Sequence, residues 1–137
     1  MKIVQFLFLG VLCMFLSCDT IVECIVNKRP ELPDTSFKVG NVNGYYYQEL
    51  TAEIKNEPRD DNYSYNFDIN GNLPDGLSVT TTNRTLVIEG MPSAPGTFNF
   101  TIYLYVEGPE YYDEESDKYK DGLCSKSTSK KYSIIIN

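Results

Sequence analysis

The side chains that could carry chemistry are carboxylates, cysteines and tyrosines, because the 137-residue chain has no histidine. Without histidine it lacks the base of Ser/His/Asp and Cys/His triads and every histidine-containing zinc site. Two of its 19 acidic residues could form the acid and base pair of a glycosidase. Nothing in the sequence specifies two carboxylates facing one cleft, so we expect a protein that is not an enzyme.

Three acidic segments are candidates for calcium, which takes roughly 6–8 oxygen ligands. They are residues 113–117, 60–62 and 68–72. The first lacks the glycine and the spacing of a known calcium loop, and the other two match cadherin-style calcium sequences only in part. We therefore predict no metal and no cofactor.

Residues 1–17 have the pattern of a secretory signal peptide. Lys2 precedes an apolar run from Ile3 to Leu16, and the small residue Ser17 follows it. A membrane-spanning helix would need about 20 apolar residues, and Asp19 ends this run too early. We therefore expect the chain to be exported.

The sequence Leu16-Ser17-Cys18 resembles the lipobox of bacterial lipoproteins, in which the cysteine becomes the first mature residue and carries acyl chains. The resemblance implies lipidation of Cys18 and attachment to a membrane; the alternative is an ordinary signal peptide with Cys18 near its cleavage site. Asp19 resembles an inner-membrane retention signal of some Gram-negative bacteria, whereas Asp19 with Glu23 resembles a surface-export signal of others. We expect an anchored protein of the Gram-negative cell envelope, at the outer membrane or cell surface rather than the inner membrane.

Cys24 and Cys124 are the cysteines that remain if Cys13 leaves with the signal peptide and Cys18 is acylated. Two thiols in an oxidising compartment favour a disulfide, and unpaired thiols or a bond to another chain are the alternatives. Without histidine, the two cysteines supply at most half of a zinc site.

The length of the chain allows one domain, and its formal net charge of −7 disfavours a nucleic-acid partner. We expect a lipidated tether at residues 18–34, which begins to pair with the sheet around residues 23–26, and a domain at 35–137. Turn-forming residues break runs rich in β-branched and aromatic residues about every 8–12 residues. The expected strands are 35–39, 45–55, 63–69, 77–81, 85–89, 97–106 and 130–136.

The clearest strand is Thr97–Val106, in which apolar and polar residues alternate strictly. Such alternation indicates one face in a core and the other in water. It places Tyr103 and Tyr105 on the outer face, and Tyr45 and Tyr47 could lie in the same way on another strand. About seven short strands of this kind predict an all-β, antiparallel β-sandwich of the immunoglobulin-like class.

Three segments carry a family resemblance: Leu73-Pro74-Asp75-Gly76-Leu77, Ile88-Glu89-Gly90-Met91-Pro92 and Pro95-Gly96-Thr97-Phe98-Asn99-Phe100. Together they resemble the LPxGL…IxGxP…PGxYxF pattern of putative-Ig, dystroglycan-type cadherin-like domains. The resemblance implies an Ig-like sandwich that serves as an adhesive module, a spacer or a sugar-binding accessory. Leu86 departs from the pattern where the family often has glycine, so we expect a different turn there.

A long insertion at 107–129 is acidic in its first half and contains Tyr111, Tyr112 and Tyr119. It is either a solvated loop or a ligand-contacting loop on a rigid scaffold. We take Tyr103, Tyr105, Tyr111 and Tyr112 as candidate ligand-binding residues, against the alternative that the strand tyrosines only cover the sheet through cross-strand pairs. The expected function is a non-catalytic envelope module binding a glycan or protein; the alternative is an assembly lipoprotein packed into a larger envelope complex.

Overall fold

The computed structural model describes residue 24 and residues 26–137. The signal peptide expected at 1–17 and the lipidation expected at Cys18 lie outside the described residues. Among the described residues, none belongs to a helix that is long and apolar enough to cross a bilayer.

The described chain is built from strands, as the sequence predicts. They are β1 (Arg29–Glu31), β2 (Tyr46–Thr51), β3 (Glu53–Lys55), β4 (Ser64–Gly71), β5 (Leu77–Thr82), β6 (Thr85–Gly90), β7 (Gly96–Glu107), β8 (Tyr111–Asp113), β9 (Lys118–Lys120) and β10 (Ser127–Ile136). A single 3-10 turn, Asp60–Asn62, lies between β3 and β4.

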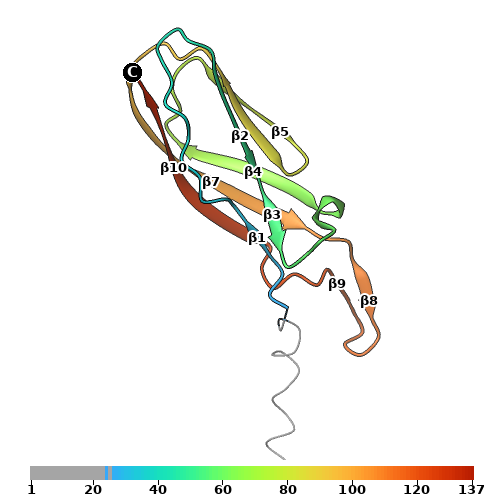
Figure 1. Cartoon of the computed structure of the whole chain (residues 1–137). Helices are drawn as coiled ribbons and strands as arrows, with labels where there is room; N and C mark the ends of the chain where they lie inside the picture. The colour runs from blue at the N-terminus through green and yellow to red at the C-terminus, as the bar shows by residue number, and fades with distance from the viewer. Residues whose placement is uncertain (1–23, 25) are drawn as a thin grey trace, which may run out of the picture.

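Two antiparallel three-stranded sheets form the sandwich, in the orders β10-β7-β4 and β2-β6-β5. Their inner faces enclose one apolar core, since alternate residues of the long strands are buried or half-buried. On β7 the buried residues are Phe100, Ile102, Leu104 and Val106, which confirms the predicted alternation. On β6 they are Leu86 and Ile88. Figure 1 shows the two sheets packed face to face along the molecule.

The segment before β2 departs from the prediction. Residues 35–39 are not a strand; Phe37 instead packs its ring on Tyr132 with a centroid distance of 5.0 Å, and Gly40 makes a single parallel bridge to Ile136. The first described strand is β1, which lies inside the segment 18–34 expected to be a tether. It pairs with β3. Leu32, directly after β1, is fully buried in the core. The expected single strand at 45–55 is divided at Ala52, whose N–H donates to the carbonyl of Arg84.

The turn between β5 and β6 explains the departure at Leu86. Thr82 pairs with Thr85 across a two-residue turn, in which Asn83 has a φ of 49°. This is a backbone conformation that asparagine tolerates well. Leu86 therefore lies inside a strand and fills the core, where a glycine would leave a void.

The two ends of the sandwich differ. One end carries the C-terminus, where the N–H of Val42 donates to the Asn137 carbonyl at 2.9 Å. The other end carries β1 and the β8–β9 hairpin (Figure 1). The expected insertion is shorter than predicted, because β10 begins at Ser127 and pairs with β7 from Tyr105 onward.

Candidate functional site

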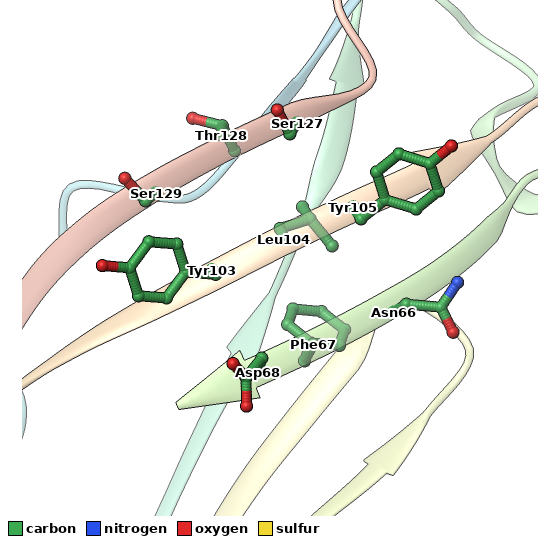
Figure 2. Close-up of a pocket in the computed structure, with 9 residues that line it drawn as sticks. All are labelled: Asn66, Phe67, Asp68, Tyr103, Leu104, Tyr105, Ser127, Thr128 and Ser129. Carbon is green, nitrogen blue, oxygen red and sulfur yellow. The ribbon is translucent and has the colours of Figure 1, made fainter. Parts of the chain in front are cut away.

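The outer face of the β10-β7-β4 sheet places two tyrosines between small polar side chains. In the strand register, Tyr105 lies between Ser127 on β10 and Asn66 on β4. In the next outward-facing row, Tyr103 lies between Ser129 and Asp68. Figure 2 shows the two rings following each other along β7, with the polar residues of the neighbouring strands on either side.

The two rings are half-exposed: 47 % of Tyr103 and 42 % of Tyr105 is accessible to solvent. Within the described part of the chain, neither hydroxyl has a hydrogen-bond partner. The outward tyrosines of the other sheet differ, because Tyr45 donates to the Glu89 carboxylate and Tyr47 to that of Glu49. These carboxylates raise the pKa of both phenols, chiefly by accepting their hydrogen bonds.

A shallow, open hollow of about 530 Å³ lies over the two rows. Its lining residues are Asn66, Phe67, Asp68, Tyr103, Leu104, Tyr105, Ser127, Thr128 and Ser129. None of these nine residues is basic, and Asp68 is the one carboxylate among them. A surface of this kind offers two rings for stacking and a rim of amide, hydroxyl and carboxylate groups for hydrogen bonds.

Lys126, a basic residue beside the hollow, is already engaged. Lys126 lies close enough to Tyr105 and Glu107 to interact with them, but its ammonium contacts the Asp121 carboxylate at 2.6 Å. That hydrogen bond raises the pKa of Lys126. Burial raises the pKa of Asp121, yet the hydrogen bonds from Lys126 and the Leu123 N–H together leave that pKa below its ordinary value. The pair is therefore ionised at neutral pH.

The four tyrosines predicted to bind a ligand do not lie together. Tyr111 and Tyr112 are on β8, in the hairpin beyond the sandwich, and neither lines the hollow over Tyr103 and Tyr105. The hairpin rings instead contact their own neighbours, with Tyr112 packed edge-on against Tyr119 at 5.4 Å. The insertion is thus an ordered hairpin at its tip, with an ion pair between Lys120 and Asp113 at 2.6 Å.

The sequence of this sandwich shows the family to which it belongs. Residues 25–120 match the sequence model of the Putative Ig domain family. The chain belongs to this family. An Ig-like domain is usually a non-catalytic binding or structural module, and its fold alone does not name a ligand.

Solved structures with a similar arrangement of the chain include parts of much longer proteins. Two structures of an endo-fucoidan hydrolase from glycoside hydrolase family 107 align with 82 % of the chain at a TM-score of 0.50, with sequence identities of 17 % and 19 %. The aligned part is only 14 % of each hydrolase chain. A titin domain aligns with 82 % of this chain and 97 % of its own length at 7 % identity and a TM-score of 0.45. No curated protein matches the chain significantly.

The Ig domain joins Cys24 to Cys124 in a disulfide across 100 residues, with a Cα–Cα distance of 5.6 Å. The Cys124 N–H also donates to the Lys28 carbonyl at 2.8 Å. Lys28 in turn contacts Glu57 at 2.6 Å, and its hydrogen bond holds the pKa of Glu57 below the ordinary value. These contacts attach the N-terminal segment to the insertion and to the turn after β3.

Two of the three acidic segments considered for calcium, 60–62 and 113–117, are engaged with cations of the chain itself. Arg84 contacts the Asp60 carboxylate at 2.6 Å and that of Asp61 at 3.1 Å. Asp113 contacts Lys120 and accepts a hydrogen bond from the Ser116 hydroxyl. In residue 24 and residues 26–137, no group of three or more candidate ligands is placed to hold a metal ion.

The outward tyrosines of this site could be predicted from the sequence, whereas the two serines of β10 could not. Alternation along residues 63–69 also predicts that Asn66 and Asp68 face outward. Ser127 and Ser129 were missed because the last strand was expected to begin at 130. Only the register of β10 against β7 brings these serines beside the rings.

Proposed function

We propose that this protein is a lipid-anchored, extracytoplasmic Ig-like module that binds an uncharged glycan through the Tyr103–Tyr105 face and does not catalyse a reaction. The observation that carries the proposal is the arrangement of that face. Two half-exposed rings with free hydroxyls lie on a central strand, each between small hydrogen-bonding side chains.

This arrangement suits a sugar chain better than a protein surface. Sugar rings have an apolar face that stacks on an aromatic ring and a rim of hydroxyls that need hydrogen-bond partners. Asn66, Asp68, Ser127 and Ser129 supply such partners on both sides of the rings. The centre of a protein interface is generally more apolar, whereas the outward side chains that flank the two rings here are all polar.

The charge around the hollow restricts the class of glycan that can bind there. None of the residues lining the hollow is basic, and Lys126 beside it is paired with Asp121. The exposed Lys131 follows Ser129 on the outer face of β10 but lies outside the lining. The chain as a whole has a net charge of −7. A sulfated or carboxylated sugar would therefore be repelled, whereas a neutral one would not.

The cellular location in this proposal rests on the sequence of residues 1–18. The apolar run that ends at Ser17-Cys18 supports export and acylation, and therefore a membrane as one partner. The Cys24–Cys124 disulfide is consistent with an oxidising compartment outside the cytoplasm. We place the protein in a Gram-negative cell envelope, at the outer membrane or cell surface, with no nucleic-acid partner.

A glycan array probed with the purified protein tests the proposal. Neutral glycans should bind, and the double variant Tyr103→Ala/Tyr105→Ala should bind them roughly thirtyfold more weakly, as expected for the loss of aromatic anchors. The matched control is Tyr45→Ala/Tyr47→Ala, which removes two exposed tyrosines with the same spacing, one directly before β2 and one on it. Equal affinities of the two double variants, or binding confined to sulfated glycans, would overturn the proposal.

A second candidate is the assembly lipoprotein, and the edges of the sandwich favour it. β4 and β5 are edge strands on which inward-facing apolar residues, among them Phe67, Ile69 and Val79, stay half-buried. A strand or domain of an envelope complex could cover them. Co-purification of a stoichiometric envelope protein whose binding is lost in Ile69→Lys, but kept in Tyr103→Ala/Tyr105→Ala, would favour this function.

A further inference from the structure

The β8–β9 hairpin lies beyond the two sheets of the sandwich, and its strands do not pair with theirs. Among the described strands, β8 and β9 pair only with each other. An isolated two-stranded hairpin is marginally stable in water. This one is held by the Lys120–Asp113 ion pair, the Tyr112–Tyr119 ring contact and the disulfide at Cys124 near its base.

The hairpin nevertheless exposes a large aromatic surface. Tyr111, Tyr112 and Tyr119 are all exposed, and Tyr119 is the most exposed large apolar side chain of the described chain at 71 %. A cluster of exposed aromatic rings on a short hairpin generally indicates a surface that another molecule or a membrane covers. Tyrosine is typical of membrane–water interfaces, because its ring is apolar and its hydroxyl remains hydrated.

The disulfide places this hairpin close to the point where the chain would meet its anchor. Cys24 lines a surface hollow together with Tyr111, Tyr119 and Lys120, so the described chain begins beside the hairpin. Five residues separate Cys24 from Cys18. Even fully extended, these six steps reach no more than about 22 Å.

We propose that the β8–β9 hairpin is a second membrane contact, lying in the lipid headgroup region with the Tyr112 and Tyr119 rings at its boundary with the acyl chains. The inference rests on the lipid anchoring in the proposed function, because the short connection brings this end of the sandwich to the membrane. The C-terminal end then points away from the bilayer (Figure 1).

The charge of the hairpin selects the kind of lipid. Its turn carries three exposed carboxylates, Glu114, Glu115 and Asp117, which outnumber the exposed Lys118 beside them. Anionic lipids would repel these carboxylates, whereas zwitterionic lipids would not. The lipid surface that fits the hairpin is therefore zwitterionic.

Because the chain contains no tryptophan, a single introduced tryptophan reports on one position. Tyr119→Trp places the reporter on the hairpin. Tyr45→Trp is the matched control, since Tyr45 is 69 % exposed and lies toward the C-terminal end of the sandwich. Each full-length, lipidated variant is reconstituted into phosphatidylcholine vesicles with and without brominated acyl chains, and its tryptophan emission is measured.

Brominated lipid should quench Tyr119→Trp at least threefold more than Tyr45→Trp, and the emission of Tyr119→Trp should shift to the blue on reconstitution. Tyr112→Trp replaces the other ring of the Tyr112–Tyr119 pair and should give the same quenching as Tyr119→Trp. It serves as a second reporter if Tyr119→Trp disturbs the hairpin. Equal quenching of hairpin and control positions in protein that floats with the vesicles would overturn the hairpin contact and leave the anchor standing. Protein that does not float at all would overturn both.

Discussion

Gly76 and Gly90 lie back to back at the end of the β5–β6 pair, where the Met91 N–H donates to the Gly76 carbonyl at 3.1 Å. Each has a positive φ, +93° and +142° respectively. A methyl group on Gly90 would overlap the carbonyl oxygen of Gly76, and one on Gly76 would overlap that of Met91. The two glycines of the family pattern are therefore needed by the same close approach of two backbones.

Gly76→Ala should destabilise the domain by about 3 kcal/mol or more, because both the backbone conformation and the contact with the Met91 carbonyl forbid a Cβ. Urea denaturation followed by circular dichroism measures the change. Gly122→Ala is the control: it also has a positive φ, but its Cβ would meet only the Tyr111 ring at 3.7 Å. The free energy of unfolding of Gly122→Ala should fall by only about 1–2 kcal/mol. Similar losses in the two variants would contradict the role given to the backbone contact.

The fold could be predicted from sequence where the information is local. The alternation from Phe98 to Val106 fixes a strand and its faces, because side chains on a strand alternate with a period of two. Residues 35–39 contain strand-forming residues but have no ladder partner, so the same local pattern predicts a strand that does not form. Phe37 is held by the rings of Phe100 and Tyr132, which come from distant strands.

The candidate site could be predicted only in part, for the same physical reason. Tyr103 and Tyr105 face outward by their own alternation, but their partners on β10 depend on a register between distant segments. The strands of the hairpin contain only three residues each, too few to show a period. That Tyr111 and Tyr112 lie apart from the hollow therefore could not be read from the sequence.

The anchor is tested by Cys18→Ala. The variant should leave the membrane fraction or remain unprocessed, because the proposed acyl chains would have no attachment point. Fractionation with an antibody against the domain measures this. A variant that is cleaved and still sediments with membranes like the wild type would show that Cys18 is not the anchor.

The Cys24–Cys124 disulfide should protect both thiols and stabilise the fold. The mature, non-reduced protein should gain no mass from an alkylating agent until it is reduced. Cys24→Ser/Cys124→Ser should lower the free energy of unfolding by about 4–5 kcal/mol, because the bond closes a loop of 100 residues in the unfolded chain. Free alkylation of both thiols in the native protein would contradict the bond.

High pH should unfold the domain through its buried tyrosines. Burial raises the pKa of Tyr46, Tyr63 and Tyr132 from 10.0 to about 12. Between about pH 10 and 12 the folded chain keeps phenol protons that the unfolded chain has lost, so the free energy of unfolding falls across this range. Below about pH 10 these tyrosines are protonated in both states and leave the free energy of unfolding unchanged.

Tyrosinate absorbance and circular dichroism, recorded together during a titration with base, measure the alkaline transition. The last part of the absorbance rise should coincide with the loss of the sheet signal. Tyr46→Phe should reduce the number of protons released in that transition by one. Ionisation of all 11 tyrosines while the sheet signal persists would contradict the prediction.

Substitutions on the two faces of β7 test which of its side chains point into the core. Phe100→Ala and Ile102→Ala remove buried side chains and should each cost about 3–5 kcal/mol, because the core cannot close over the void. Tyr103→Ala and Tyr105→Ala remove half-exposed rings and should each cost less than about 1 kcal/mol, the range of cross-strand pairs.

Urea denaturation of the four single variants and of Tyr103→Ala/Tyr105→Ala measures the contrast. The double variant should stay folded, so any loss of glycan binding in it reports on the site and not on the fold. If it unfolds as readily as Phe100→Ala, the two rings belong to the core and cannot act as a binding surface. If it stays folded and binds neutral glycans as the wild type does, the sandwich is correct and the tyrosine face is not the site.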